Sequence, residues 1–103
     1  MAFLWIQEFE HVAFEGQGYD VPCAKQPNVT EQVEAITTGS TQSNAFNART
    51  KFVELKTDVD CHIKFGANPT ASKTTGGTTL LEAGERVYYG VNPGDFVAVI
   101  DDT

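Results

Sequence analysis

The sequence predicts an all-β protein, an antiparallel β-sandwich or jelly-roll-like barrel of seven or eight short strands. The strand-favouring residues Thr, Val, Phe and Tyr are abundant, whereas the helix-forming residues Leu and Met are scarce. Bulky side chains alternate along several short runs, and Gly, Pro and Asn separate these runs. The 103 residues, 41% of them hydrophobic, are enough for one core, so we expect a single domain over residues 1–103.

The N-terminal residues predict two strands, over 2–6 and 10–14, with a break near 7–9. Residues 1–9 are also a candidate N-terminal arm. In that arrangement residues 2–6 add a strand to the sheet edge of a neighbouring molecule, and Trp5 anchors it. The alternative is a strand within the chain's own sheet.

Residues 29–36 fit two kinds of secondary structure. Val29, Val33 and Ile36 have helical spacing, but Val33 and Ala35 also belong to an alternating pattern. The threonines that follow favour a strand. Two polar stretches, 39–44 and 66–79, are expected to be surface loops.

The middle of the chain gives the strongest strand signal. Side chains alternate in character along residues 51–57, and residues 61–66 have one apolar and one polar face. The link between them is short and acidic, which predicts that the two strands form a hairpin. Cys61 falls on the apolar face, where a thiol packs as a small hydrophobic group.

The C-terminal part predicts three more strands. Residues 79–82 form a short one that ends at an Ala-Gly turn, and residues 86–91 form the next. Residues 92–95, Asn-Pro-Gly-Asp, then predict a type II turn, because Pro suits its second position and Gly its third. Residues 96–100 are apolar on both faces, as in a central strand.

The chain is acidic, with 14 acidic and 7 basic residues and a formal net charge of −7. We therefore expect no direct binding to nucleic acid and none to anionic membranes, since both need cationic contacts. The N-terminus has no basic leader, and no apolar run is long enough to cross a bilayer, which predicts folding in a cytoplasm. Cys23 and Cys61 are then expected to be free thiols, with a disulfide between them as the alternative.

No catalytic, cofactor-binding or metal-binding residues are predicted. Cys61 and His62 are adjacent, so on a strand their side chains point to opposite faces and cannot pair. The cysteines and histidines lack the spacing of a zinc site; they are His11, Cys23, Cys61 and His62. The aspartates of the turns lack the pattern of a calcium loop and are expected to be solvated: Asp58, Asp60, Asp101 and Asp102.

Aromatic residues are the candidates for an interface. Tyr and Trp give a large contact area at low entropic cost, which makes Phe3, Trp5 and the pair Tyr88 and Tyr89 the interface candidates. The two tyrosines are strand neighbours, so we expect one to pack in the core and the other to face outward. A carbohydrate-binding platform is the alternative use of such aromatic residues.

Three segments, 52–55, 60–71 and 89–100, carry a resemblance to known proteins. With them, residues 50–100 resemble small structural proteins of tailed bacteriophages. The resemblance implies a non-enzymatic virion component, assembled in the cytoplasm of a host bacterium. Its most frequent role would be that of a capsid decoration, or cement, protein that bridges coat subunits.

The partners implied are the major capsid protein or other virion proteins, together with further copies of the chain in a dimer or trimer. A head–tail or tail component is an alternative role within the virion. A carbohydrate- or host-binding module is the alternative outside that class.

Overall fold

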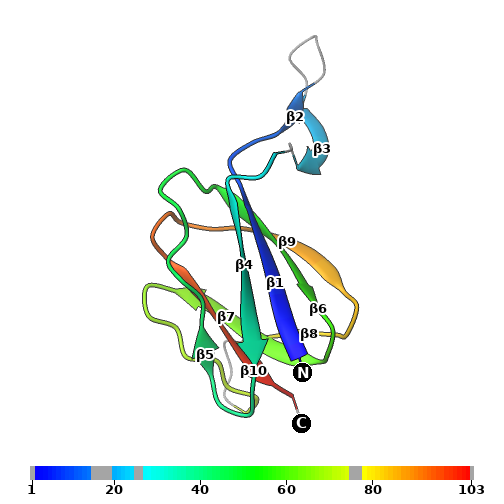
Figure 1. Cartoon of the computed structure of the whole chain (residues 1–103), viewed down its shortest axis with the longest axis vertical. Coiled ribbons are helices and arrows are strands. Elements are labelled where there is room, and N and C mark those ends of the chain that lie inside the picture. Colours follow the sequence, from blue (N-terminus) through cyan, green and yellow to red (C-terminus); the bar gives the residue numbers. More distant parts are fainter. Residues whose placement is uncertain (1, 15–19, 25–26, 75–77, 103) are drawn as a thin grey trace.

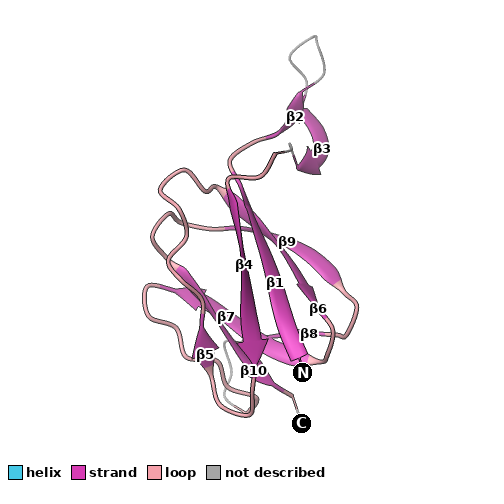
Figure 2. Ribbon diagram, viewed as in Figure 1, coloured by secondary structure: helices cyan, strands magenta, loops and turns pink. Residues whose placement is uncertain are grey.

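The computed structural model describes residues 2–14, 20–24, 27–74 and 78–102, and of residues 12–14 and 20–24 it describes the backbone. Two antiparallel sheets of four strands pack face to face, which confirms the predicted β-sandwich (Figure 1, Figure 2). The strands are β1 (Ala2–Phe9), β2 (Val12–Phe14), β3 (Asp20–Ala24), β4 (Thr30–Ile36), β5 (Thr41–Gln42), β6 (Phe52–Thr57), β7 (Cys61–Gly66), β8 (Thr79–Leu81), β9 (Arg86–Gly90) and β10 (Phe96–Asp101).

The first sheet has the strand order β4-β1-β6-β9, and the second has the order β5-β10-β7-β8. The short strands β2 and β3 pair with each other in a separate hairpin. In Figure 1 this hairpin projects from the end of the sandwich that lies opposite the two termini. The two four-stranded sheets therefore contain the body of the protein.

The core lies between the two sheets and is built by period-two alternation. In the first sheet Ile6 lies opposite Leu55, and Leu55 lies opposite Val87, so these three side chains share the inner face. Side chains of the second sheet meet them from β7, β8 and β10. The buried cluster contains Leu4, Ile6, Ile36, Phe46, Val53, Leu55, Cys61, Ile63, Leu81, Val97 and Val99.

Strand β1 is a central strand, which replaces the candidate N-terminal arm of residues 1–9. It pairs with β4 on one side and with β6 on the other, so neither edge is open to a neighbouring molecule's sheet. It also continues to Phe9, without the break expected near residues 7–9. The reason is that Glu8, which interrupts the apolar run in the sequence, is buried and hydrogen-bonded within the fold.

The predicted hairpin of β6 and β7 is wrong, although both strands are present. They belong to different sheets, and the link between them crosses the sandwich. Asp58 accepts a hydrogen bond from the Phe3 amide, and Asp60 accepts one from the Ala83 amide. These bonds fix the link in a crossing conformation, which lets the apolar faces of both strands turn toward one core.

Several other local predictions are confirmed. Residues 30–36 form a strand, and β10 is a central strand between β5 and β7. The 92–95 turn has Gly94 at φ 83° and a hydrogen bond from the Asp95 amide to the Asn92 carbonyl. The polar stretch 39–44 differs from a plain loop, because it contains the two-residue strand β5.

Cys61 is a free and fully buried thiol on the inner face, as its alternation with Ile63 predicts. Burial raises the pKa of this thiol, because the thiolate would lose its hydration, and the Thr57 hydroxyl 3.7 Å from Sγ opposes the shift. The side chain of Cys23 lies outside the described residues.

We predict that the Cys61 thiol reacts with a disulfide reagent only when the protein unfolds, because both access and the thiolate are suppressed in the fold. The measurement is the labelling rate of a Cys23→Ser variant in buffer and in denaturant. Equal rates in the two conditions would contradict the buried position of the thiol.

Candidate interaction surface

The first sheet has an outer face, formed by the side chains of β4, β1, β6 and β9 that point away from the second sheet. Cross-strand register places Phe3 opposite Ala35, and Trp5 opposite Val33. These four side chains form an apolar corner of the outer face. Trp5 is 39% exposed and Val33 54% exposed, although burial of both would be favourable.

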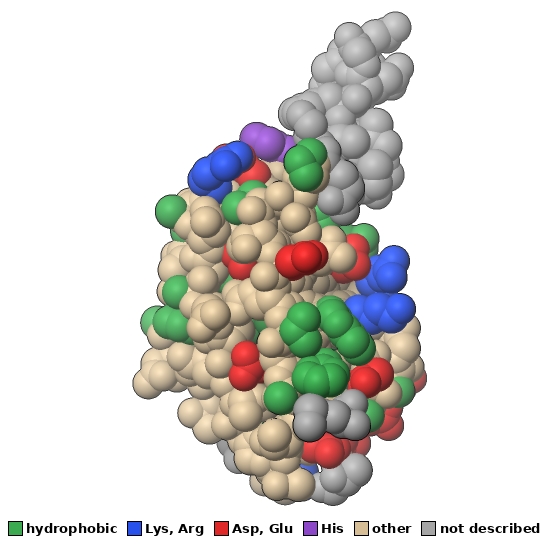
Figure 3. Space-filling view, in the orientation of Figure 1, with side chains coloured by type: hydrophobic (Ala, Val, Ile, Leu, Met, Phe, Trp, Pro, Cys, Tyr) green, Lys and Arg blue, Asp and Glu red, His purple; other side chains and the backbone are tan. Residues whose placement is uncertain are grey.

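The apolar corner is one continuous surface rather than scattered residues. The Phe3 and Trp5 rings are 6.1 Å apart and tilted at 55°, a favourable edge-to-face type of contact. Figure 3 shows hydrophobic side chains gathered on the face formed by β1 and β4, with basic side chains beside them. A hollow borders Trp5 between these two strands; it is lined by Trp5, Ile6, Gln7, Glu31, Gln32 and Val33.

A polar band crosses the same face on the β6 and β9 side. Lys56 lies between Trp5 and Arg86 in the register. Glu54 accepts a hydrogen bond of 2.6 Å from the Tyr88 hydroxyl and forms an ion pair with Arg86, 3.3 Å between Oε1 and Nε. The apolar corner therefore has basic groups along one side.

The far end of the outer face is aromatic and closed. Phe9 and Phe52 stack with ring centroids 5.3 Å apart, and Tyr88 lies 6.5 Å from Phe52. Phe9 is fully buried even though it points to the same side of β1 as Trp5. The outer-face side chains of β1 are thus exposed at Trp5 and covered at Phe9.

Three of the four predicted interface residues share this face: Phe3, Trp5 and Tyr88. Tyr89 lies on the inner face, where its ring is 5.3 Å from that of Phe65. The expectation that one tyrosine faces inward and the other outward is confirmed, because Tyr88 is 53% exposed. Val33 was missed, since only the pairing of β4 with β1 brings it beside Trp5.

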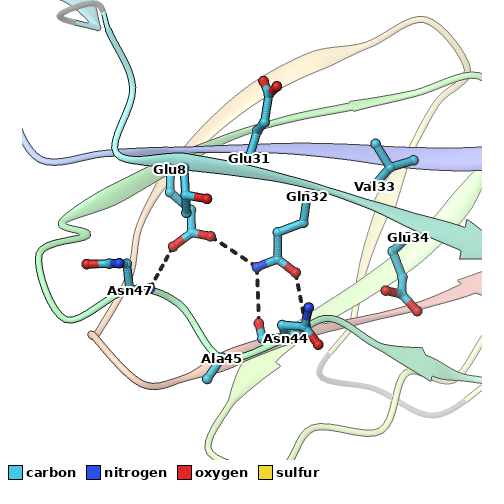
Figure 4. Close-up of a pocket in the computed structure, with 9 residues that line it drawn as sticks. Glu8, Glu31, Gln32, Val33, Glu34, Asn44, Ala45 and Asn47 are labelled. Carbon is cyan, nitrogen blue, oxygen red and sulfur yellow. Dashed lines mark hydrogen bonds between the residues drawn. The ribbon is translucent and has the colours of Figure 1, made fainter.

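A groove runs between β4 and residues 44–47, and Glu8 lies at its base (Figure 4). The Glu8 side chain is on the inner face of β1 and 1% exposed. Its Oε1 accepts hydrogen bonds of 2.7 Å from the Asn47 amide and the Thr50 hydroxyl, and its Oε2 accepts one of 3.0 Å from Gln32. The carboxylate therefore joins two strands to the 43–50 connection.

The same groove holds Asn44 against a side chain of β4. The side-chain amide of Gln32 donates to the Asn44 carbonyl and accepts from the Asn44 amide, which imitates a strand ladder. Further along, the Thr41 hydroxyl donates to the Ala35 carbonyl. Partial burial in this region raises the pKa of Glu34, and a hydrogen bond from Thr41 opposes that shift. Polar side chains that line this groove are thus engaged in hydrogen bonds within the protein.

Among the described side chains, Cys61 is not brought together with either histidine. Cys61 points into the core, whereas His62 lies on the other side of β7, where its Nε2 is 2.6 Å from Asp102 Oδ1. His11 is beside Glu10, whose pKa is lowered chiefly by the hydrogen bond from Arg49. The expectation that Cys61 and His62 cannot pair is confirmed.

The turn aspartates gather at one end of the sandwich. Asp58, Asp60, Asp101 and Asp102 border a shallow depression with Val59 and Ala83. Asp58 and Asp60 bind backbone amides, as described above, and Asp102 binds His62. Within residues 2–14, 20–24, 27–74 and 78–102, no group of three or more His, Cys, Asp and Glu side chains has the arrangement of a metal site.

The chain matches no family model, and no curated protein or solved structure is similar enough to count as a match. The described part of the chain contains no helix with the length and apolar character needed to cross a membrane.

We predict that replacing Glu8 with Gln lowers the free energy of unfolding by about 2 kcal/mol, because an amide offers one acceptor where three donors converge. Glu31→Gln on the adjacent strand is the matched control, since Glu31 is exposed; its effect should stay within about 0.5 kcal/mol. Urea unfolding measures both. Equal losses would show that the Glu8 bonds are not special.

We also predict that two aromatic residues of β1 differ sharply in their contribution to stability. Phe9→Ala should cost about 3–5 kcal/mol, because it leaves a cavity beneath Phe52. Trp5→Ala should cost distinctly less, because its ring is already partly in water. The measurement is again urea unfolding. A Trp5 variant as unstable as the Phe9 variant would contradict a surface role for Trp5.

Proposed function

We propose that this protein is a non-enzymatic bacteriophage virion structural protein, a capsid decoration protein that binds coat subunits through the outer face of its first sheet. The observation that carries the proposal is the apolar corner of Phe3, Trp5, Val33 and Ala35. It leaves Trp5 and Val33 substantially exposed on a rigid sheet face. Exposed apolar patches on rigid elements are typical of protein-binding surfaces.

The chemistry of the face favours a protein as the ligand. Trp is among the residues that contribute most to protein binding energy, and a charged rim around an apolar centre excludes water and sets orientation. Lys56 and Arg86 supply such a rim on one side of Trp5. The proposed partner surface is therefore apolar at its centre and acidic at the border that meets these two residues.

The physical role would be multivalent bridging. Many copies, each with a modest contact across a seam between coat subunits, stabilise an assembled shell because they bind it better than separate subunits. The resemblance of residues 50–100 to phage structural proteins is the reason for placing this binding on a virion.

We predict that substitutions at the apolar corner remove shell binding without unfolding the protein. Trp5→Ser combined with Val33→Ser should weaken co-sedimentation with shells that lack the protein by about 100-fold or more, since two central contacts of 1–3 kcal/mol each are lost. Leu80→Ser is the matched control, because Leu80 is 47% exposed on the second sheet. Equal binding by both variants would contradict the proposed surface.

Copy number separates the roles within a virion. A decoration protein should approach the abundance of the coat protein in quantitative mass spectrometry of purified virions, whereas a few copies per particle would indicate a head–tail or tail component. Trp5 and Tyr88 also share a face with polar groups between them, so a glycan array is a direct test of the carbohydrate-binding alternative. Saturable glycan binding that is lost in Trp5→Ala would replace the decoration role.

A further inference from the structure

Strand β9 forms the long open edge of the first sheet. In the order of the described strands it pairs with β6 on one side only, over five residues. At the opposite edge, β4, the Thr41 hydroxyl donates to the Ala35 carbonyl. Open sheet edges present unpaired backbone groups and are sites where another strand adds.

Along β9, the backbone N–H and C=O groups of successive residues point alternately toward β6 and away from it. The bonds to β6 show which residues point away. The Val91 amide donates to the Lys51 carbonyl, whereas the Lys51 amide donates to the Phe9 carbonyl on β1, so Lys51 and Val91 share one bond only. That bond flanks the opposed residues Gly90 and Phe52 and marks them as a pair that is not hydrogen-bonded. In an antiparallel ladder such pairs alternate with hydrogen-bonded pairs, which makes Tyr89 and Val87 bond toward β6. The backbone groups of Arg86 and Gly90, at the two ends of the strand, consequently point away from β6.

We infer that β9 pairs antiparallel with β9 of a second copy of this chain, about a two-fold axis at Tyr88. This register places Arg86 opposite Gly90 of the second copy, and each of these residues presents outward-pointing backbone groups to the other. The two four-stranded sheets then form one continuous sheet of the order β4-β1-β6-β9-β9-β6-β1-β4.

The charges of the strand suit a second copy. The chain carries a net charge of −7, so most of its surface repels an identical molecule. Strand β9 has the sequence Arg-Val-Tyr-Tyr-Gly, with one basic residue and no acidic residue. In the two-fold register Arg86 does not lie opposite Arg86 of the second copy. It faces Gly90, the one residue of the strand without a side chain.

The side chains on both faces also fit this pairing. A Cβ built on Gly90 has no atom within 4 Å, and Phe52 lies opposite Gly90 on β6, so the Arg86 side chain of the second copy has open space beside an aromatic ring. On the inner face, Val87 and Tyr89 are only partly buried in one chain. Pairing sets Val87 against Tyr89 of the second copy and covers apolar surface that β6 leaves exposed.

Two measurements test the pairing: the mass of the protein in solution, and the register of the two β9 strands. Sedimentation equilibrium should give twice the mass of one chain at high protein concentration. In a Cys23→Ser background, oxidation of Tyr88→Cys should then trap a disulfide dimer, because residues opposed at a hydrogen-bonded position have Cα atoms about 5.5 Å apart, within reach of a disulfide. Arg86→Cys is the matched control, since its two copies would lie about 13 Å apart along the strands.

A second pair of variants tests the backbone bonds themselves. Arg86→Pro removes an outward amide and no bond to β6, and should weaken dimerisation about tenfold or more. Arg86→Ala loses the same ion pair with Glu54 but keeps the amide, and should dimerise better than the proline variant. A single-chain mass throughout the concentration series, or equal crosslinking at positions 86 and 88, would overturn the inference. The pairing does not depend on a virion role, so failure of shell binding leaves it standing.

Discussion

The buried carboxylate of Glu8 is the constraint on which the arrangement of the first sheet depends. A buried acidic group is costly unless donors surround it, and here the donors come from β4 and from the connection that leads into β6. Glu8 thus fixes the 43–50 connection against the end of β1. That connection also bonds to the second sheet, where the Ser43 amide donates to the Val97 carbonyl and the Phe46 amide to the Asp95 carbonyl. Glu8 therefore holds in place the connection that bonds the first sheet to the second.

This arrangement explains why the two faces and the two edges of the first sheet differ. The inner face of β1 ends in the polar network of Glu8, and alternation places the other apolar side chains of the strand, Phe3, Trp5 and Phe9, on the outer face. At the Phe52 end they are covered by aromatic stacking, whereas at Trp5 and Val33 they remain exposed. At the β4 edge the Ala35 carbonyl accepts a hydrogen bond from the Thr41 hydroxyl, whereas β9 pairs with β6 alone among the described strands.

The proposed interaction surface and the proposed dimer reinforce each other. Two copies joined at β9 present two apolar corners on one continuous sheet, one on each side of the shared strands. A ligand with repeated sites, such as a shell of identical coat subunits, would then be bound at two points by one dimer. The second contact becomes intramolecular, which raises avidity without any new type of interaction. Each contact of a small acidic protein with the shell can then be weak, because the dimer binds the shell at two points.

The alternation of side chains was enough to locate β6, β7, β9 and β10 and to assign the β class, because the period of two is a local property of a strand. Opposite faces for neighbouring residues followed from it, as Cys61 with His62 and Tyr88 with Tyr89 illustrate. Strand partners did not follow: the link after Thr57 crosses between sheets because Asp58 and Asp60 bind distant amides. The apolar corner and the Glu8 network could not be predicted from alternation either, since each joins residues far apart in the chain. Only the tertiary structure decides which strands pair and which of these side chains are buried. The reason is that non-local hydrogen bonds and the exclusion of water select among strand partners that look equivalent along the sequence.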